Sequence, residues 1–126
     1  MQPEESRYDR GLGNMRAIFG QGIESALETL SATSPDLVRC LIEFPFGDIY
    51  SRPGLDLKTR EMLTVAALTV LGYPQAELKE HIQGALNVGC TRDEISEIIL
   101  QMAVYAGFPA ALEAVKTAAV VFGEKQ

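Results

Sequence analysis

The chain has 126 residues, of which 47% are hydrophobic and 22% are charged, and its formal net charge is −6. This length and composition predict one soluble globular domain, spanning residues 1–126, with a substantial hydrophobic core. The excess of acidic residues argues against nucleic acid and against an anionic membrane surface as partners.

The first predicted helix runs from about Tyr8 to Leu30, because apolar residues recur there at steps of three and four. It contains four glycines, each of which weakens an exposed helix by roughly 1 kcal/mol relative to alanine. We therefore expect this helix to need a partner surface. The stretch "SPDL" then starts a second helix, with Ser34 at the N-cap and Pro35 at the first helical position. That helix is expected to end at Pro45, where the predicted loop "PFGDIYSRPGL" begins.

The third predicted helix begins after Asp56 and continues to about Leu71. Its most apolar part, "MLTVAALTVL", is about half the length that a bilayer requires. This segment is therefore expected to be a buried helix, and no membrane partner is predicted. The chain does not open with the basic, apolar and small-residue pattern of a secretory signal, so a cytoplasmic location is expected.

Three further helices are predicted in the second half of the chain. The stretch "GYPQ" precedes a helix that ends at Gly89, and "TRDE" at 91–94 is a capping box at the start of the next helix. The last helix begins near Pro109 and closes at Gly123. No segment alternates as a strand does, so the sequence predicts an all-α fold of five to six helices.

The helix "AELKEHIQGALNVG" contains His81, the only histidine of the chain. At about 100° per residue, His81 falls within the apolar stripe, and Glu77 joins the same stripe one turn earlier. A surface histidine is expected among polar residues, so the pattern predicts that the ring of His81 points inward.

The two cysteines, Cys40 and Cys90, lie fifty positions apart with no second cysteine near either. This spacing supports neither a metal site nor a dithiol motif, and two buried free thiols are expected.

Three stretches, "GDIYSRPGLDLKTREMLTVAAL", "HIQGALNVGCTRDEI" and "QMAVYAGFPAALEA", resemble the carboxymuconolactone decarboxylase family in their order and spacing. The resemblance covers roughly residues 35–122. It implies the all-α alkylhydroperoxidase-D-like helical domain, which usually assembles into a ring-like homohexamer. A homo-oligomer, hexamer or trimer, is therefore expected, and the glycine-rich first helix would suit packing against a neighbouring subunit.

The family has a peroxidase branch and a decarboxylase branch, and the histidine helix separates them. The peroxidase branch carries a Cys-x-x-Cys-x-x-x-His motif whose cysteines reduce peroxide. Here His81 matches the histidine, but Pro74 and Glu77 stand at the two cysteine positions. Neither can act as a thiolate, so the chain is more similar to the decarboxylase branch.

The reaction that this resemblance implies is loss of carbon dioxide from 4-carboxymuconolactone in the catabolism of aromatic compounds. No cofactor is implied, because the unsaturated lactone itself accepts the electrons left behind. The implied partner is a small anionic organic substrate. The protein must bind it, stabilise the developing enolate and return a proton to carbon.

His81 is the leading candidate for proton transfer, because histidine is the side chain that ordinarily titrates near neutrality. Glu61 opens the buried run of the preceding helix and is expected to approach His81, as an acid or as a group that orients the imidazole. The alternative for His81 is a core histidine bonded to a backbone carbonyl. For Glu61, the alternative is a favourable interaction with the helix dipole.

The remaining candidates are residues that contact the substrate. Arg52, Lys58 and Arg60 place three basic residues within nine positions of an acidic chain, and Arg52 and Arg60 are expected to bind carboxylate. The alternative is ion pairing with acidic residues. Tyr50 and Tyr105 can supply hydroxyl donors, although aromatic residues at helix ends usually pack, and Glu77 is a weaker candidate beside His81.

Two other functions remain open at this point. The first is an alkylhydroperoxidase-like antioxidant protein of peroxiredoxin type, which would require a reactive thiol at Cys40 or Cys90. The second is a non-enzymatic oligomer that binds a small acid. The residues do not distinguish 4-carboxymuconolactone from a related carboxylated ring, since one fold serves many functions.

Overall fold

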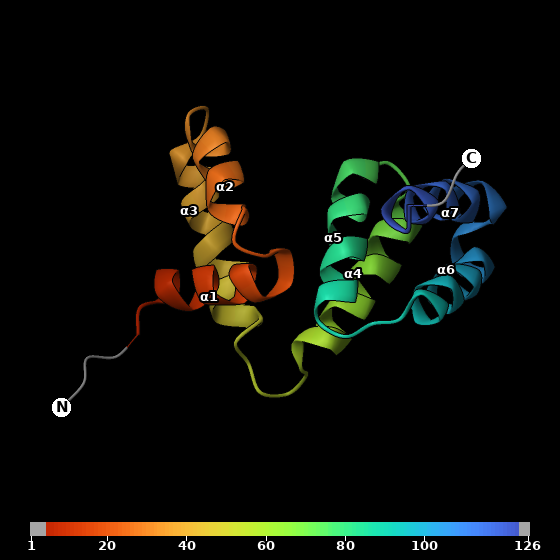
Figure 1. The fold of residues 1–126 in the computed structure, drawn as a ribbon, viewed down its shortest axis with the longest axis horizontal. Coiled ribbons are helices and arrows are strands. Elements are labelled where there is room, and N and C mark those ends of the chain that lie inside the picture. Colours follow the sequence, from red (N-terminus) through yellow and green to blue (C-terminus); the bar gives the residue numbers. More distant parts are fainter. Residues whose placement is uncertain (1–4, 124–126) are drawn as a thin grey trace. The chain divides into compact units, whose positions relative to one another are not determined.

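A computed structural model describes residues 5–123, and within that range the chain forms helices and turns with no strand (Figure 1). The predicted all-α class is confirmed. The described residues divide into two compact units, with the boundary between Asp56 and Leu57. The first unit contains α1 (Arg7–Phe19), α2 (Ile23–Ser31), α3 (Pro35–Leu41) and the π-helix η1 (Ile42–Ile49). The second contains α4 (Leu57–Leu71), α5 (Gln75–Asn87), α6 (Arg92–Ala106) and α7 (Phe108–Val121).

The first predicted helix is two helices, so the single segment expected from Tyr8 to Leu30 is wrong. The break lies at Gly20, whose φ of 88° belongs to the left-handed region that glycine adopts without steric cost. The amide of Gly20 closes α1 by donating to the carbonyl of Arg16. The apolar spacing continues through the break because both helices bury a face, so periodicity alone conceals it.

The loop predicted from Pro45 is also wrong in its first half, because residues 42–49 form η1. A π-helix bonds each amide to the carbonyl five residues earlier. The amide of Tyr50 donates to the carbonyl of Pro45 in this way, at 2.8 Å. Proline has no amide to donate, but its carbonyl still accepts, so Pro45 is accommodated inside the element.

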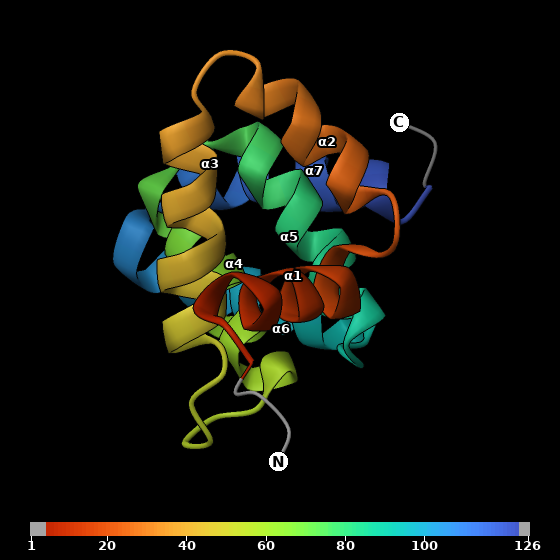
Figure 2. The ribbon, with the colours of Figure 1, turned by 90° about the vertical axis from the view of Figure 1, so that its left-hand side faces the viewer.

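The first unit is built on close contact between α1 and η1. In Figure 2, α2 and α3 diverge from the loop that joins them, and α1 lies across the lower part of the unit. Helix α2 contacts α3, and α1 contacts η1. A Cβ on Gly11 would collide with the backbone carbonyl of Ile42, so only glycine permits this approach. Arg7 and Asp48 join the same two elements through a bidentate ion pair with a shortest distance of 2.8 Å. This guanidinium lowers the pKa of the Asp48 carboxyl. The partner surface expected for the glycine-rich helix is thus present within the chain.

The start of α3 follows the predicted pattern in position only. Ser34 occupies the N-cap and Pro35 begins the helix, but the Ser34 side chain makes no capping hydrogen bond. The buried face of α3 includes Val38. Cys40, two positions further on, points elsewhere on the helix and is exposed, so the expectation that both thiols are buried is wrong for Cys40 and correct for Cys90.

The second unit packs four helices around one apolar core. Helix α4 contacts α5, α6 and α7, and Figure 1 shows α5 alongside α4. The buried core comprises Val65, Leu78, Ile82, Ala85, Cys90, Ile95, Ile99, Ala111, Ala114 and Ala118. Because α4 and α5 are joined by a short connection at 72–74 and pack together, side chains from the two helices meet in the interior.

The predicted capping box at the start of α6 is confirmed. The Thr91 hydroxyl accepts from the amide of Glu94 at 3.0 Å, and the Glu94 carboxylate accepts from the amide of Thr91 at 2.9 Å. Lys58 reaches the same carboxylate at 3.2 Å. The backbone bond first, and then Lys58, lower the pKa of Glu94. Lys58, one of the three basic residues between positions 52 and 60, is therefore engaged in an ion pair, which is the alternative expected for that cluster.

No helix within residues 5–123 is both long enough and apolar enough to cross a membrane.

Candidate active site

The centre of the candidate site is a buried pair formed by Glu61 on α4 and His81 on α5. His81 Nδ1 lies 2.8 Å from Glu61 Oε2, and the two residues are 9% and 0% exposed. Each stands on the inward face of its helix, among the side chains that join α4 to α5. The predicted inward orientation of His81 and its predicted contact with Glu61 are both confirmed.

The pairing assigns different roles to the two nitrogens of the imidazole. A carboxylate oxygen can only accept a hydrogen bond, so Nδ1 carries the hydrogen when Glu61 is ionised. Nε2 then remains as the atom that exchanges a proton with a ligand. Glu77 Oε2 lies 3.9 Å from Nε2, and the Glu77 side chain is 62% exposed. Nε2 thus lies on the side of the ring that faces the solvent-exposed carboxylate of Glu77.

The second carboxylate oxygen of Glu61 departs from the rule that buried polar groups make hydrogen bonds. Oε1 is buried and has no hydrogen-bond partner among the described residues. Leaving a buried acceptor without a donor costs about 1–3 kcal/mol, and more for a charged group. Residues that tolerate such a cost are concentrated at functional sites. The geometry therefore favours a chemical role for this pair over a purely structural one.

Arg60 is adjacent to Glu61 at the start of α4. Its Nε is buried, and its backbone carbonyl accepts a hydrogen bond from the Thr64 hydroxyl at 2.9 Å. The Nε atom of Arg60 is thus shielded from solvent, and the residue is fixed in position by the α4 backbone. A guanidinium there is suited to bidentate binding of a carboxylate.

Three other predicted site residues, Tyr50, Arg52 and Tyr105, come from other segments of the chain. Tyr50 and Arg52 belong to the first unit, where the Tyr50 ring lies 4.9 Å from that of Phe46. Tyr105 lies near the end of α6 and is 75% exposed. Glu61 and Glu77 are the predicted site residues whose distances to the His81 ring are described.

Glu80 is a residue of this region that the sequence pattern did not single out. It follows Glu77 by three positions and precedes His81, on what the helical pattern indicates to be the polar face of α5. Although the residue is exposed overall, partial desolvation of its carboxyl raises its pKa, and the negative charge of Glu77 adds to that effect. The signal that could have identified Glu80 is its i, i+3 spacing from another carboxylate.

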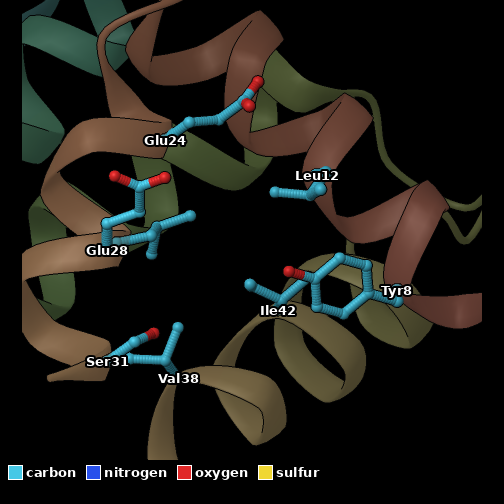
Figure 3. Close-up of a pocket in the computed structure, with 8 residues that line it drawn as sticks. Tyr8, Leu12, Glu24, Glu28, Ser31, Val38 and Ile42 are labelled. Carbon is cyan, nitrogen blue, oxygen red and sulfur yellow. The ribbon is translucent and has the colours of Figure 1, made fainter. Parts of the chain in front are cut away.

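A separate pocket of about 240 Å³ lies in the first unit (Figure 3). Apolar side chains from α1, α2, α3 and η1 line it, and Glu24 and Glu28 stand on one side. Arg16 pairs with Glu24 at 2.6 Å. None of the site residues predicted from the sequence lines this pocket.

The sequence of the chain matches a known protein family. The model of the carboxymuconolactone decarboxylase family matches residues 35–119. The chain belongs to the carboxymuconolactone decarboxylase family. Both Glu61 and His81 lie inside the matched range.

Three relatives extend the match. A 4-carboxymuconolactone decarboxylase of Acinetobacter baylyi is 37% identical over 120 residues, covering 94% of this chain and 89% of the relative. An uncharacterized 15.0 kDa protein of Paracoccus denitrificans is 39% identical, covering 79% of this chain and 73% of the relative. A nitrosuccinic acid decarboxylase of Metarhizium robertsii is 34% identical, with 85% and 75% covered. Two members of the carboxymuconolactone decarboxylase family that are similar to this chain are thus named as decarboxylases of different substrates.

Proposed function

We propose that the protein is a cofactor-free decarboxylase that acts on 4-carboxymuconolactone or a closely related carboxylated lactone. The observation that carries this proposal is the hydrogen bond between buried Glu61 and His81 Nδ1, which leaves Nε2 as the proton-exchanging atom. The name and 37% identity of the Acinetobacter baylyi relative support the substrate class.

In the proposed reaction, the bond between the ring carbon and the leaving carboxylate breaks, and carbon dioxide departs. The electron pair moves into the unsaturated lactone to give an enolate. His81 Nε2 then delivers a proton to carbon, and the ring regains a proton from solvent, so one proton is consumed in each cycle. Glu61 holds the imidazole in one tautomer and orientation, as an acidic partner does for a catalytic histidine in other enzymes.

Arg60 is the residue that we propose for binding substrate carboxylate. It stands beside Glu61 in the N-terminal part of α4, where the helix dipole also favours an anion. Arg52, Tyr50 and Tyr105 remain candidates for contacts with the rest of the substrate. Because no redox step occurs, the proposed chemistry requires no cofactor.

We further propose that the protein is a homo-oligomer. Large apolar side chains on α6 and α7 remain exposed in the single chain, as a protein that associates with copies of itself requires.

The test is release of carbon dioxide from 4-carboxymuconolactone by purified protein and three variants. His81→Ala is expected to lower kcat by at least about 100-fold, because general acid catalysis contributes about 10²–10⁴. Glu61→Gln, which keeps an acceptor for Nδ1 but removes the charge, is expected to lower kcat less. Lys79→Ala, at an exposed position of the same helix, is the matched control and should retain full activity.

Two outcomes would contradict the proposal. The first is no turnover of the lactone by the wild-type protein, and the second is turnover in His81→Ala above about a tenth of wild type with helical content unchanged. A Cys40→Ala/Cys90→Ala variant distinguishes the peroxidase alternative. It should decarboxylate normally, whereas a thiol-dependent activity would be lost.

A further inference from the structure

An acidic residue stands beside Nε2 of the His81 ring. Glu77 Oε2 lies 3.9 Å from Nε2, and the Glu77 side chain is in contact with solvent. Glu80 follows three positions later, and the negative charge of Glu77 contributes to raising its pKa. A ligand group placed at Nε2 would therefore lie close to the Glu77 carboxylate.

The charged groups around the ring can be assigned helix by helix. Helix α4 contributes Glu61, which binds Nδ1 on the buried side. Helix α5 contributes Glu77 and Glu80, and Lys79 acts on the Glu80 carboxyl. Helix α7, which also packs on α5, carries Glu113 and Lys116, and these lie 3.3 Å from each other.

The negative charge of Glu77 is therefore not balanced by a nearby cation. Within residues 5–123, the ion pair that Glu77 forms is the one with His81, and no lysine or arginine lies within ion-pair distance of it. An imidazole that has given up its proton leaves this carboxylate without a counter-charge. A second carboxylate placed beside Nε2 would therefore be repelled when a substrate binds to the neutral imidazole.

We propose that Glu77 is a specificity-determining residue, which selects against substrates that place a second carboxylate beside His81 Nε2. The inference rests on the proposed function and names the substrate class more narrowly. The preferred substrate carries its leaving carboxylate toward the basic start of α4. At the outer edge of the ring, this substrate presents a group that is neutral or that donates a hydrogen bond.

The kinetic test compares two substrates in the wild type and two variants. The substrates are 4-carboxymuconolactone and the same lactone with its second, non-leaving carboxylate converted to a methyl ester. Glu77→Gln removes the charge at the ring. Glu97→Gln makes the same change of charge at an exposed position of α6 and is the matched control.

Glu77→Gln is expected to raise kcat/KM for the dianionic lactone by about threefold to tenfold, chiefly through KM, and to change the ester much less. The gain should shrink in about 0.5 M salt, because screening already weakens the repulsion in the wild type. Glu97→Gln should show neither effect. An unchanged or raised KM in Glu77→Gln overturns the inference, and a raised KM would indicate that Glu77 accepts a hydrogen bond from the substrate.

A second measurement does not depend on turnover. Because the chain has one histidine, its ring proton resonances can be assigned without ambiguity. An anionic paramagnetic chelate is expected to broaden them several-fold less than a neutral chelate of the same size in the wild type. Glu77→Gln should reduce that difference more than Glu97→Gln does, and equal effects of the two variants would overturn the inference. If His81→Ala kept full activity while this probe gave the expected result, the proposed function would fail and the local charge effect would stand.

Discussion

At the scale of single residues, the Glu61–His81 pair is costly to bury. Removing a carboxylate and an imidazole from water carries a desolvation penalty that one hydrogen bond repays only partly. Glu61 Oε1 adds to this cost, because it is buried without a partner among the described residues. The pair is therefore expected to serve chemistry and to contribute little to stability, as active-site groups often do.

This expectation can be tested by a double-mutant cycle. His81→Leu is expected to lower the free energy of unfolding by about 3 kcal/mol, because it leaves the Glu61 carboxylate buried with no partner for either oxygen. Glu61→Met combined with His81→Leu is expected to recover most of that loss, since both polar groups are then replaced by apolar groups of similar size. Urea unfolding of the wild type, His81→Leu, Glu61→Met and the double variant measures both effects. A double variant less stable than His81→Leu alone would show that the pair stabilises the fold.

The direction of the His81 side chain was predictable from helical phase alone, but the surroundings of its ring were not. Glu77 was expected on the same apolar stripe, and yet its side chain is 62% exposed. A helical wheel gives the direction of a side chain and does not show how far the neighbouring helices extend along it. Glu77 stands in the first turn of α5, at the edge of the packed surface. The missing partner of Glu61 Oε1 likewise depends on three-dimensional packing, which no spacing in the sequence records.

At the scale of helices and their crossings, the structure shows roles of individual glycines that the sequence pattern left open. The first helical region contains four glycines, which predict weak helix and a need for a partner. The structure separates their roles. Gly20 ends α1 with a positive φ, and Gly11 allows η1 to approach α1. Gly13 has open space around it.

Gly11 and Gly13 therefore form a matched pair of substitution sites on one helix. Gly11→Ala is expected to destabilise the protein by about 3 kcal/mol, because its Cβ would collide with the backbone of Ile42 and the two elements would have to separate. Gly13→Ala is expected to stabilise it by up to about 1 kcal/mol, because alanine is the better helix former and nothing obstructs its methyl group. Thermal unfolding followed by circular dichroism measures both. Equal effects of the two changes would show that the α1–η1 contact is not tight in solution.

The π-helix marks the limit of pattern-based prediction at this scale. Residues 42–49 contain a proline, a glycine and four aromatic or β-branched side chains at no regular period, which is typical of a loop. Their backbone is held from outside, since the Asn14 side chain donates to the carbonyl of Phe46 at 2.7 Å and to the Ser51 hydroxyl at 2.8 Å. Contacts between residues more than thirty positions apart thus select this conformation, and local sequence does not reveal them.

At the scale of the whole molecule, helical periodicity was sufficient for the all-α class, and the family resemblance supplied the expectation of assembly. The division into two compact units was not apparent, because the boundary at Asp56 coincides with an ordinary helix start. The sequence pattern likewise did not show which apolar residues are exposed. Positions such as Val104 and Phe108 belong to regular apolar stripes and resemble core residues in the sequence. Yet they are 78% and 72% exposed in the single chain.

The proposed association of copies through α6 and α7 would account for these exposures and can be tested with one substitution. Leu100 and Val104 lie one turn apart on α6, and Phe108 and Leu112 lie one turn apart on α7, which packs against it. Val104→Glu is expected to lower the mass of the assembly, because a buried interface does not tolerate an unpaired charge. Gln101→Glu, at an exposed polar position of α6, adds the same charge and should leave the mass unchanged. Light scattering should give several times 13.7 kDa for the wild type and for Gln101→Glu. A wild-type mass of one chain, or an assembly that survives Val104→Glu with its helical content intact, would show that these stripes are not the interface.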